Sequence, residues 1–280
     1  MVNKQSVTSR AIGEYYIRKR GVPLANLCSI DTPPEESIAR TVYDRPYVTL
    51  KWAESADGKV AGAGGKRVQI SNPRATKLVH ELRARCDAIT VGINTVLSDD
   101  PLLIARDVHA ARPLIRVVLD SQLRIPMESK LVRTARQHRV IVFYDRRLAE
   151  AERNKLRELE QAGVQPFLVE RRFDGLNLEQ VLTPLAHFGV THVLVEPGPT
   201  LANAFFNELT LADRVWLVHS PNKIDAVDAQ AGIGVPGHYV KAGEIDVDGD
   251  RVTEYLNPQS PVFFSATASA DFVIAQKPAP

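Results

Sequence analysis

The stretch Val193-Leu194-Val195-Glu196-Pro197-Gly198-Pro199-Thr200-Leu201-Ala202 decides the fold. Its first residues form an apolar, largely β-branched run, which is typical of a strand buried on both faces of a sheet. After Gly198 the apolar residues Leu201 and Phe205 recur with helical spacing, and Pro199 suits the first position of a helix. The stretch therefore predicts a buried strand, a tight turn and a helix.

The turn at Gly198 is a candidate anion site. The first turn of a helix carries unpaired backbone N–H groups and the positive end of the helix dipole, and both attract phosphate. Glu196 stands at the carboxyl end of the strand, where open α/β sheets bind their ligands. Strand–turn–helix joints with a glycine also occur throughout α/β proteins, so a ligand site and a plain structural turn both stay open at this point.

Composition limits the classes of protein that the chain can represent. Its 280 residues are 44% hydrophobic and 24% charged, as in ordinary soluble domains. The formal charge of +2 is too small for the basic surface of a nucleic-acid-binding protein, so an acidic ligand would need local positive charge. No apolar run of about 18 residues is present, and residues 1–20 lack the apolar centre of a signal peptide. We expect a cytoplasmic protein without nucleic-acid or membrane partners.

The cysteines and histidines predict no metal site. Cys28 and Cys86 form no C-x-x-C pair, which fits a reducing compartment. The zinc-deaminase signature, H-x-E followed by P-C-x-x-C, does not occur in the chain. The isolated His80, His109 and His187 are expected to be surface or core groups rather than metal ligands.

Strand and helix patterns alternate through the middle of the chain, which predicts a mainly parallel sheet covered on both faces. The expected strands cover residues 47–53, 87–93, 114–119, 140–144, 164–169, 193–195 and 213–219. Helices are expected from Pro73, over 147–162 and 176–188, and from Pro199. Residues 94–101 are expected to form a loop, and the glycine-rich residues 62–65 either a hairpin loop or a flap. Strands within 240–255 and at 271–275 predict an antiparallel edge.

Polar side chains gather at the predicted strand ends. Because the carboxyl ends of parallel strands meet at one edge of a sheet, these side chains are expected to form a cleft for a polar, phosphorylated ligand. The residues concerned are Lys51, Asp57, Thr95, Asp99, Ser121 and Glu196, with Arg83 and Arg106 nearby.

Several segments, taken in order, resemble the reductase half of the bacterial riboflavin-biosynthesis deaminase/reductase, the RibD C-terminal domain family. They read PYVTLKWA at 46–53, SADGKVA at 55–61, LRA at 82–84, the run from Gly92 to Leu102, RVVLDS at 116–121 and VEPGPTLA at 195–202. The resemblance implies a dihydrofolate-reductase-like α/β fold with three layers, α/β/α, a mostly parallel central sheet and an antiparallel C-terminal edge. It assigns residues 46–280 to the reductase domain and leaves residues 1–45 as an N-terminal extension of unclear role.

The same resemblance implies an activity. The expected reaction is the NADPH-dependent reduction of the ribosyl group of 5-amino-6-(5-phosphoribosylamino)uracil to ribityl, by hydride transfer to C1′. The sequence shows no deaminase half, so either a separate deaminase is expected, or the substrate is the undeaminated 2,5-diamino-6-ribosylamino-pyrimidinone 5′-phosphate. A reductase of another pterin-like compound and a non-catalytic nucleotide-binding protein are the alternatives. The resemblance also suggests a homodimer.

The resemblance further assigns roles to individual residues. Lys51 and Asp57 would assist proton transfer while the sugar ring opens, and Glu196 would hold the sugar or base by hydrogen bonds. The guanidinium groups of Arg83 and Arg106 suit the substrate phosphate. The complete substrate set is Arg67, Arg83, Leu103, Arg106 and Glu196. The cofactor set is Ala53, Gln69, Thr95, Asp99, Ser121, Gly198, Pro199, Thr200 and Leu201.

Overall fold

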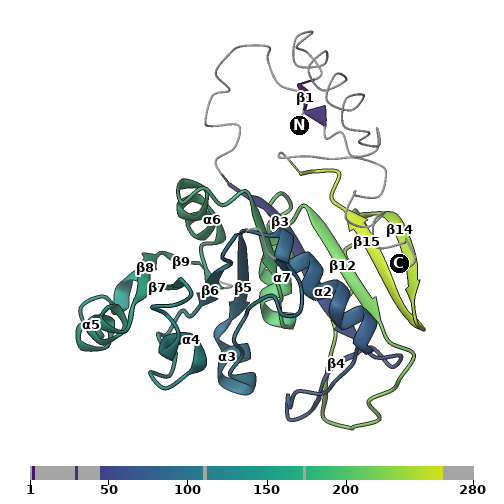
Figure 1. The fold of residues 1–280 in the computed structure, drawn as a ribbon, viewed down its shortest axis with the longest axis horizontal. Coiled ribbons are helices and arrows are strands. Elements are labelled where there is room, and N and C mark those ends of the chain that lie inside the picture. The colour runs from purple at the N-terminus through teal and green to yellow at the C-terminus, as the bar shows by residue number, and fades with distance from the viewer. Residues whose placement is uncertain (1, 4–28, 31–44, 110–111, 173–174, 261–280) are drawn as a thin grey trace.

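The computed structural model describes residues 2–3, 29–30, 45–109, 112–172 and 175–260 (Figure 1). Two short strands, β1 (Val2–Asn3) and β2 (Ser29–Ile30), pair in parallel. The strand expected at 271–275 lies outside the described residues. Within the described ranges, no helix combines the length and the apolar character that spanning a membrane requires.

A nine-stranded sheet organises the chain, in the order β14-β15-β12-β3-β11-β5-β6-β7-β8. Neighbours from β12 to β8 run parallel, whereas β15 is antiparallel to both β12 and β14. The predicted parallel sheet with an antiparallel C-terminal edge is therefore confirmed. The strands are β3 (Tyr47–Glu54), β5 (Ala88–Gly92), β6 (Ile115–Leu119), β7 (Val140–Asp145), β8 (Val164–Val169), β11 (His192–Val195), β12 (Arg214–His219), β14 (Val240–Val247) and β15 (Asp250–Leu256).

Helices cover both faces of this sheet, as the three-layer prediction required (Figure 1). Val193 and Val195 of β11 pack with Leu185 and Phe205, which belong to the helices of one face, whereas Leu194 packs with the helix of the other face. The first face carries α6 (Leu178–His187) and α7 (Pro199–Asn207). The second carries α2 (Pro73–Arg85), α3 (Ile93–Asp99), α4 (Lys130–Arg133) and α5 (Arg153–Ala162).

Strand β3 places its polar residues on the α2 face. Side chains alternate along a strand, so Val48 and Leu50 enter the core under α6 and α7, whereas Thr49 and Lys51 lie on the opposite face. The register with β12 sets Arg214 beside Thr49 and Trp216 beside Lys51. Lys51 is only partly buried, and it lies one residue beyond Leu50, which pairs with Val195, the last residue of β11.

Two local predictions were wrong. Residues 94–101 are not a loop, because α3 runs from Ile93 to Asp99. Ile93 and Val96 form its buried face, and the polar residues between them hid this short apolar pattern. The helix expected over 147–162 begins only at Arg153, because Asp145 accepts a hydrogen bond from the Arg147 backbone and starts a separate 3₁₀ turn.

A second, two-stranded sheet lies outside the large one. Strand β4 (Lys59–Ala63) pairs antiparallel with β13 (Ala229–Ala231). Gly64 and Gly65 follow β4 with φ of 63° and 75°, values that favour glycine, and they turn the chain back. A further short antiparallel pair joins β9 (Arg171–Arg172) to β10 (Gly175–Leu176).

Candidate active site

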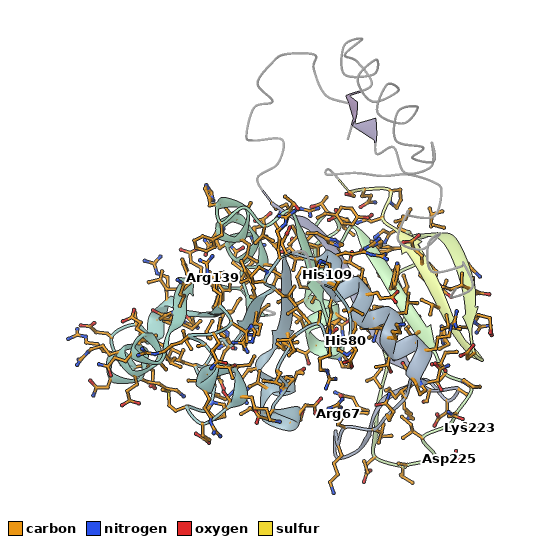
Figure 2. All side chains as sticks on the ribbon, viewed as in Figure 1. Arg67, His80, His109, Arg139, Lys223 and Asp225 are labelled. Atoms are coloured by element: carbon orange, nitrogen blue, oxygen red, sulfur yellow. The ribbon has the colours of Figure 1, made fainter. Side chains whose placement is uncertain are left out.

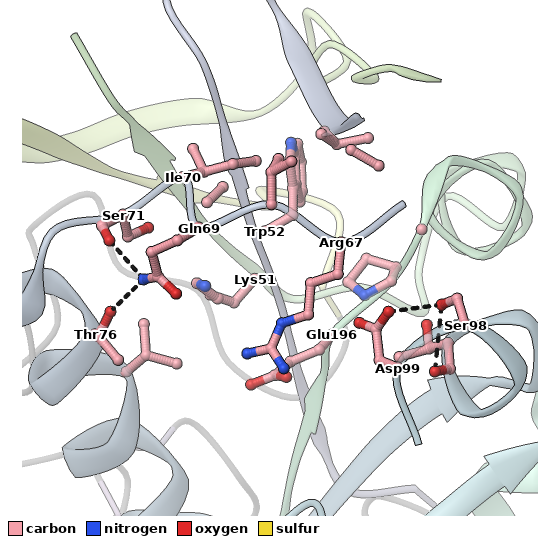
Figure 3. Close-up of a pocket in the computed structure, with 18 of the residues that line it drawn as sticks. Lys51, Trp52, Arg67, Gln69, Ile70, Ser71, Thr76, Ser98, Asp99 and Glu196 are labelled. Carbon is pink, nitrogen blue, oxygen red and sulfur yellow. Dashed lines mark hydrogen bonds between the residues drawn. The ribbon is translucent and has the colours of Figure 1, made fainter. Parts of the chain in front are cut away.

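A cavity of about 320 Å³ opens at the carboxyl ends of β3 and β11 (Figure 3). Its walls come from α2, from α3, from the turn before α7 and from the segment that follows β4. Arg67 and Gln69 point inward from that last segment (Figure 3). The cavity is lined by Lys51, Trp52, Ala53, Val60, Ala61, Gly65, Arg67, Val68, Gln69, Ile70, Ser71, Thr76, Val79, His80, Arg83, Thr95, Ser98, Asp99, Arg106, Glu196, Pro197, Gly198 and Gln230.

Most of the predicted site residues meet in this cavity, although they come from distant parts of the chain. The predicted residues that line it are Lys51, Ala53, Arg67, Gln69, Arg83, Thr95, Asp99, Arg106, Glu196 and Gly198. The predicted residues that do not line it are Asp57, Leu103, Ser121, Pro199, Thr200 and Leu201. The contacts that each residue would make with a ligand stay predictions.

The cavity carries more positive than negative charge. Four cationic side chains line it, whereas the acidic lining consists of Asp99 and Glu196. The whole chain has a net charge of only +2. The positive charge that an acidic ligand requires is therefore concentrated locally, at this cavity.

Helix α2 supplies one wall of the cavity. Its N-cap Asn72 accepts a hydrogen bond from the Ala75 backbone at 2.8 Å, and the helix begins at Pro73, as predicted. Thr76, His80 and Arg83 follow at spacings of four and three residues, so they share one face of the helix. All three line the cavity.

Arg83 and Glu196 form a two-pronged ion pair across the cavity floor. Arg83 Nε donates to Glu196 Oε1 at 2.8 Å, and Nη2 donates to Oε2 at 2.6 Å. Their side chains are 15% and 19% exposed. Burial favours the neutral form of each group, but their mutual attraction outweighs it. The pKa of Arg83 is therefore raised, and the pKa of Glu196 is lowered. Arg83, expected to hold phosphate, is thus already paired with a carboxylate.

Lys51 stands beside this pair. Burial lowers the pKa of Lys51 below its usual value, because the ammonium loses hydration. Glu196 opposes the shift and Arg83 adds to it. A lysine with a lowered pKa exchanges its proton more readily near neutral pH, which is a property of general acid–base groups.

Arg106 and His80 form a second group on the cavity wall. The Arg106 backbone N–H donates to His80 Nδ1 at 3.1 Å, and Arg106 Nη2 lies 3.5 Å from His80 Nε2. Burial lowers the pKa of His80, and the charges of Arg83 and Arg106 lower it further. The imidazole is therefore neutral around pH 7.

A buried arginine supports the segment that carries Leu103 and Arg106. Arg116 on β6 has no exposed surface, and burial lowers its pKa to about 10. Its Nη1 donates to the Leu102 carbonyl at 3.2 Å and to Thr134 Oγ1 at 2.8 Å. Leu103 is 4% exposed and packs into the core rather than into the cavity.

Asp57 lies in the turn between β3 and β4. Its carboxylate accepts hydrogen bonds from Ser55 Oγ at 2.6 Å and from the Ile224 backbone at 3.0 Å. The Ser55 hydrogen bond is the main reason that the pKa of Asp57 is lowered. These contacts join the turn to the segment after β12, which is a structural role, and the catalytic role of Asp57 stays a prediction.

The turn before α7 has the features that a phosphate group requires. Gly198 caps the helix, and its Cα faces open space, with no atom within 4 Å of where a Cβ would lie. Pro199 occupies the first helical position, as predicted, and the next backbone N–H groups have no partner of their own within the helix. Ser98 donates to Asp99 Oδ1 at 2.8 Å on the facing wall (Figure 3). The residues present therefore fit a nucleotide cofactor.

Sequence reasoning missed several cavity residues. His80, Thr76 and Val79 share the helix face of Arg83, so the spacing on α2 could have identified them. Gln230 carries no such signal, because it reaches the cavity through the pairing of β13 with β4. Residues 232–237 match the pattern G-x-G-x-x-G. They join β13 to β14, however, and no helix follows them, so they do not form the strand–turn–helix unit that binds a dinucleotide.

The described part of the chain contains no cluster of three or more His, Cys, Asp or Glu side chains that could hold a metal ion. Cys86 is buried, with its sulfur 3.5 Å from His192 Nδ1, and Cys28 lies outside the described residues.

Comparison with known proteins shows which family the chain belongs to. Residues 46–229 match the family described as the RibD C-terminal domain. The chain is 32% identical to the riboflavin biosynthesis protein RibD of Aquifex aeolicus over 187 residues, which cover 67% of this chain and 49% of that protein. It is 33% identical to the 2,5-diamino-6-ribosylamino-4(3H)-pyrimidinone 5′-phosphate reductase of Archaeoglobus fulgidus, covering 66% of this chain and 84% of that protein.

The solved structures agree with this result. A diaminohydroxyphosphoribosylaminopyrimidine deaminase/5-amino-6-(5-phosphoribosylamino)uracil reductase from Thermotoga maritima superimposes with a TM-score of 0.61 at 26% identity. The match covers 78% of this chain and 58% of that one, so the chain spans little more than half of such two-function relatives. The matched residues 46–229 include both Lys51 and Glu196. The chain belongs to the RibD C-terminal domain family.

Proposed function

We propose that this protein is an NADPH-dependent reductase of riboflavin biosynthesis that acts on a phosphoribosylamino-pyrimidine. The observation that carries the proposal is the meeting of Lys51, Arg106, the Arg83–Glu196 pair and Gly198 in one cavity. A sugar phosphate and a dinucleotide can approach each other only where their two sets of binding groups adjoin. The family membership of the chain supports the same assignment.

The cofactor would be held along the α7 side of the cavity. The free N–H groups after Gly198 suit its diphosphate, while Gln69, Thr95 and Asp99 offer hydrogen-bonding groups on the facing walls. When bound, a reduced nicotinamide supplies the hydride that the reaction needs. The choice of NADPH over NADH rests on the resemblance described above.

The protein's own groups would orient the sugar and move its proton. Lys51 would donate a proton to the ring oxygen of the ribosyl group as the ring opens, and its lowered pKa supports this role. Glu196 is ionised, and two hydrogen bonds from Arg83 hold its carboxylate in a fixed position. Its oxygens would accept hydrogen bonds from sugar hydroxyl groups.

Two substrates fit the proposal, and they differ only by deamination of the pyrimidine. The uracil form is the substrate named for the Thermotoga maritima structure. The undeaminated form is named for the Archaeoglobus fulgidus relative, most of whose length this chain covers. That second match favours the undeaminated compound as an alternative substrate.

A direct assay tests the proposal. Purified protein is mixed with NADPH and with each pyrimidine separately, and loss of the reduced-nicotinamide absorbance is followed together with the ribityl product. We expect turnover with at least one of the two compounds, and slower turnover with NADH. Intact NADPH binding without reduction of either compound would reject the reductase and favour a non-catalytic nucleotide-binding protein. Equal turnover of a dephosphorylated substrate would favour a reductase of another pterin-like compound.

A further inference from the structure

We propose that His80 is an additional ligand of the substrate's 5′-phosphate, donating a hydrogen bond from Nε2 beside the Arg106 guanidinium. This inference rests on the proposed function, and it names a group that neither the sequence reasoning nor the family resemblance assigned. It follows from the hydrogen-bonding roles that the geometry imposes on the two nitrogens of this imidazole.

The backbone of Arg106 fixes the tautomer of His80. A backbone N–H can only donate, so His80 Nδ1, at 3.1 Å from it, must be the acceptor. A neutral imidazole then carries its proton on Nε2. Burial and the neighbouring cations Arg83 and Arg106 keep the ring neutral, although Glu196 and Asp107 partly oppose them.

This tautomer leaves two donors facing each other. His80 Nε2–H lies 3.5 Å from Arg106 Nη2, and a guanidinium nitrogen has no lone pair to accept with. The two groups therefore cannot satisfy one another. An oxyanion placed between them would accept from both, and phosphate offers the required oxygens. Both residues line the cavity, so such an anion could reach them (Figure 2 labels His80 beside α2).

The nearest alternative cation is already neutralised. Arg83 directs Nε and Nη2 to Glu196 and Nη1 to the Ile104 carbonyl. In contrast, Arg106 forms no ion pair with a carboxylate of the described residues, although Asp107 is its direct neighbour in sequence. The unbalanced charge and the spare imidazole donor thus occur at the same place, which is where an added anion would be most favourable.

Two sources of oxyanion could occupy this place, namely the sugar phosphate and a phosphate of the dinucleotide. We assign it to the sugar phosphate, because Arg106 and His80 belong to the wall formed by α2 and the segment after α3, whereas Gly198 and the start of α7 form another wall.

Nuclear magnetic resonance of protein labelled with ¹⁵N-histidine tests the proposal without any need for turnover. Long-range ¹H–¹⁵N spectra of the unmodified protein should show the Nε2–H tautomer for His80. Ribose 5-phosphate should shift its Nε2 signal, whereas ribose and NADPH alone should not. A different tautomer, no shift with ribose 5-phosphate, or an equal shift with NADPH alone would overturn the assignment.

Two amide variants separate ligand binding from support of the Arg106 backbone. His80→Gln can place an amide nitrogen near the Nε2 position, whereas His80→Asn can keep only the acceptor near the Nδ1 position. We expect His80→Asn to weaken ribose 5-phosphate binding by at least about tenfold, the usual effect of losing a hydrogen bond to a charged group, with His80→Gln much closer to wild type. The reverse order would show that His80 only supports the backbone.

The outcome for His80 is independent of the outcome for the reaction. If ribose 5-phosphate shifts His80 but neither pyrimidine is reduced, the phosphate ligand stands and the proposed function fails. If a pyrimidine is reduced while the His80 signal ignores ribose 5-phosphate, the proposed function stands and His80 is not a phosphate ligand.

Discussion

Two polar clusters lie on the α2 face of the sheet and differ in what surrounds them. The cavity cluster consists of Lys51, His80, Arg83, Arg106 and Glu196. The amino-end cluster consists of Thr49, His192, Arg214, Trp216 and Glu254. In the latter, Arg214 Nε donates to Thr49 Oγ1 at 2.9 Å and Trp216 Nε1 donates to Glu254 Oε1 at 2.9 Å.

The difference shows that a polar residue inside a strand does not by itself mark a functional site. Thr49 and Lys51 are two residues apart on one face of β3, yet Thr49 is fully buried and hydrogen-bonded, whereas Lys51 borders the cavity. Position along the strand separates them, because ligands approach parallel sheets at the carboxyl ends of the strands. Charge in the amino-end cluster should therefore govern stability, whereas charge in the cavity cluster should govern activity and add to stability where it is paired, as at Glu196.

Replacing Lys51 tests the cavity side of this comparison. We expect Lys51→Met to lower kcat/KM by at least about 100-fold, since general acid–base groups contribute roughly 10²–10⁴-fold. Tm should stay the same or rise, because a partly buried ammonium is removed. Thr49→Val is the matched control on the same face of β3, and it should lower Tm while each folded molecule keeps its activity. The reverse pattern in the two variants would contradict the comparison.

Replacing Glu254 tests the amino-end side. Glu254→Gln removes the charge 3.6 Å from Arg214, and both side chains are almost completely buried. Breaking a buried ion pair typically costs about 3–5 kcal/mol, so urea denaturation should show a loss of free energy of unfolding near that size. Activity measured well below the denaturation midpoint should stay near that of the wild type. A loss of activity without loss of stability would place Glu254 in the function of the enzyme.

Acid titration should distinguish Glu196 from an ordinary surface carboxylate. The folded pKa of Glu196 lies below its usual value of 4.5. The group therefore stabilises the folded state above about pH 4.5, and this contribution is lost as the pH falls through the folded pKa. The difference in free energy of unfolding between wild type and Glu196→Gln should shrink between pH 6 and 3, as followed by urea denaturation at each pH. A constant difference would mean that Arg83 does not hold the pKa down.

The smallest effect is expected at Asp57. Asp57→Asn keeps an oxygen that can accept from Ser55 and from the Ile224 backbone, so the turn should persist. We expect kcat/KM to fall far less than for Lys51→Met, well under the roughly 100-fold minimum of a general acid–base group. A loss equal to that of Lys51→Met would instead support the direct proton-transfer role that the family resemblance implied. The same steady-state assay distinguishes the structural role of Asp57 from the proton-transfer role.

The sequence predicted the features that local patterns encode. The buried run of β11, the turn at Gly198 and the start of α7 at Pro199 were all identified correctly, since each depends on residues close together in the chain. Helix α3 was missed because seven residues give too few turns for a clear apolar stripe.

Pairings between distant residues could not be predicted in the same way. Arg83 was expected to face phosphate, but it is paired with Glu196, and no local pattern links these two positions. Likewise, the spacing on α2 could place His80 on the helix face of Arg83, but it could not predict the hydrogen bond that His80 accepts from the Arg106 backbone. Such contacts depend on how the strands are ordered in the sheet.

The ribbon of β4 and β13 has a consequence for how the protein is made. Its two strands are separated in the chain by almost all of the parallel sheet, so their pairing must close a very long loop. During synthesis, β3, α2 and β11 leave the ribosome well before Gln230 does. A nascent chain can therefore form β3 and β11 before β13 is available to pair with β4, the strand after which Arg67 and Gln69 enter the cavity.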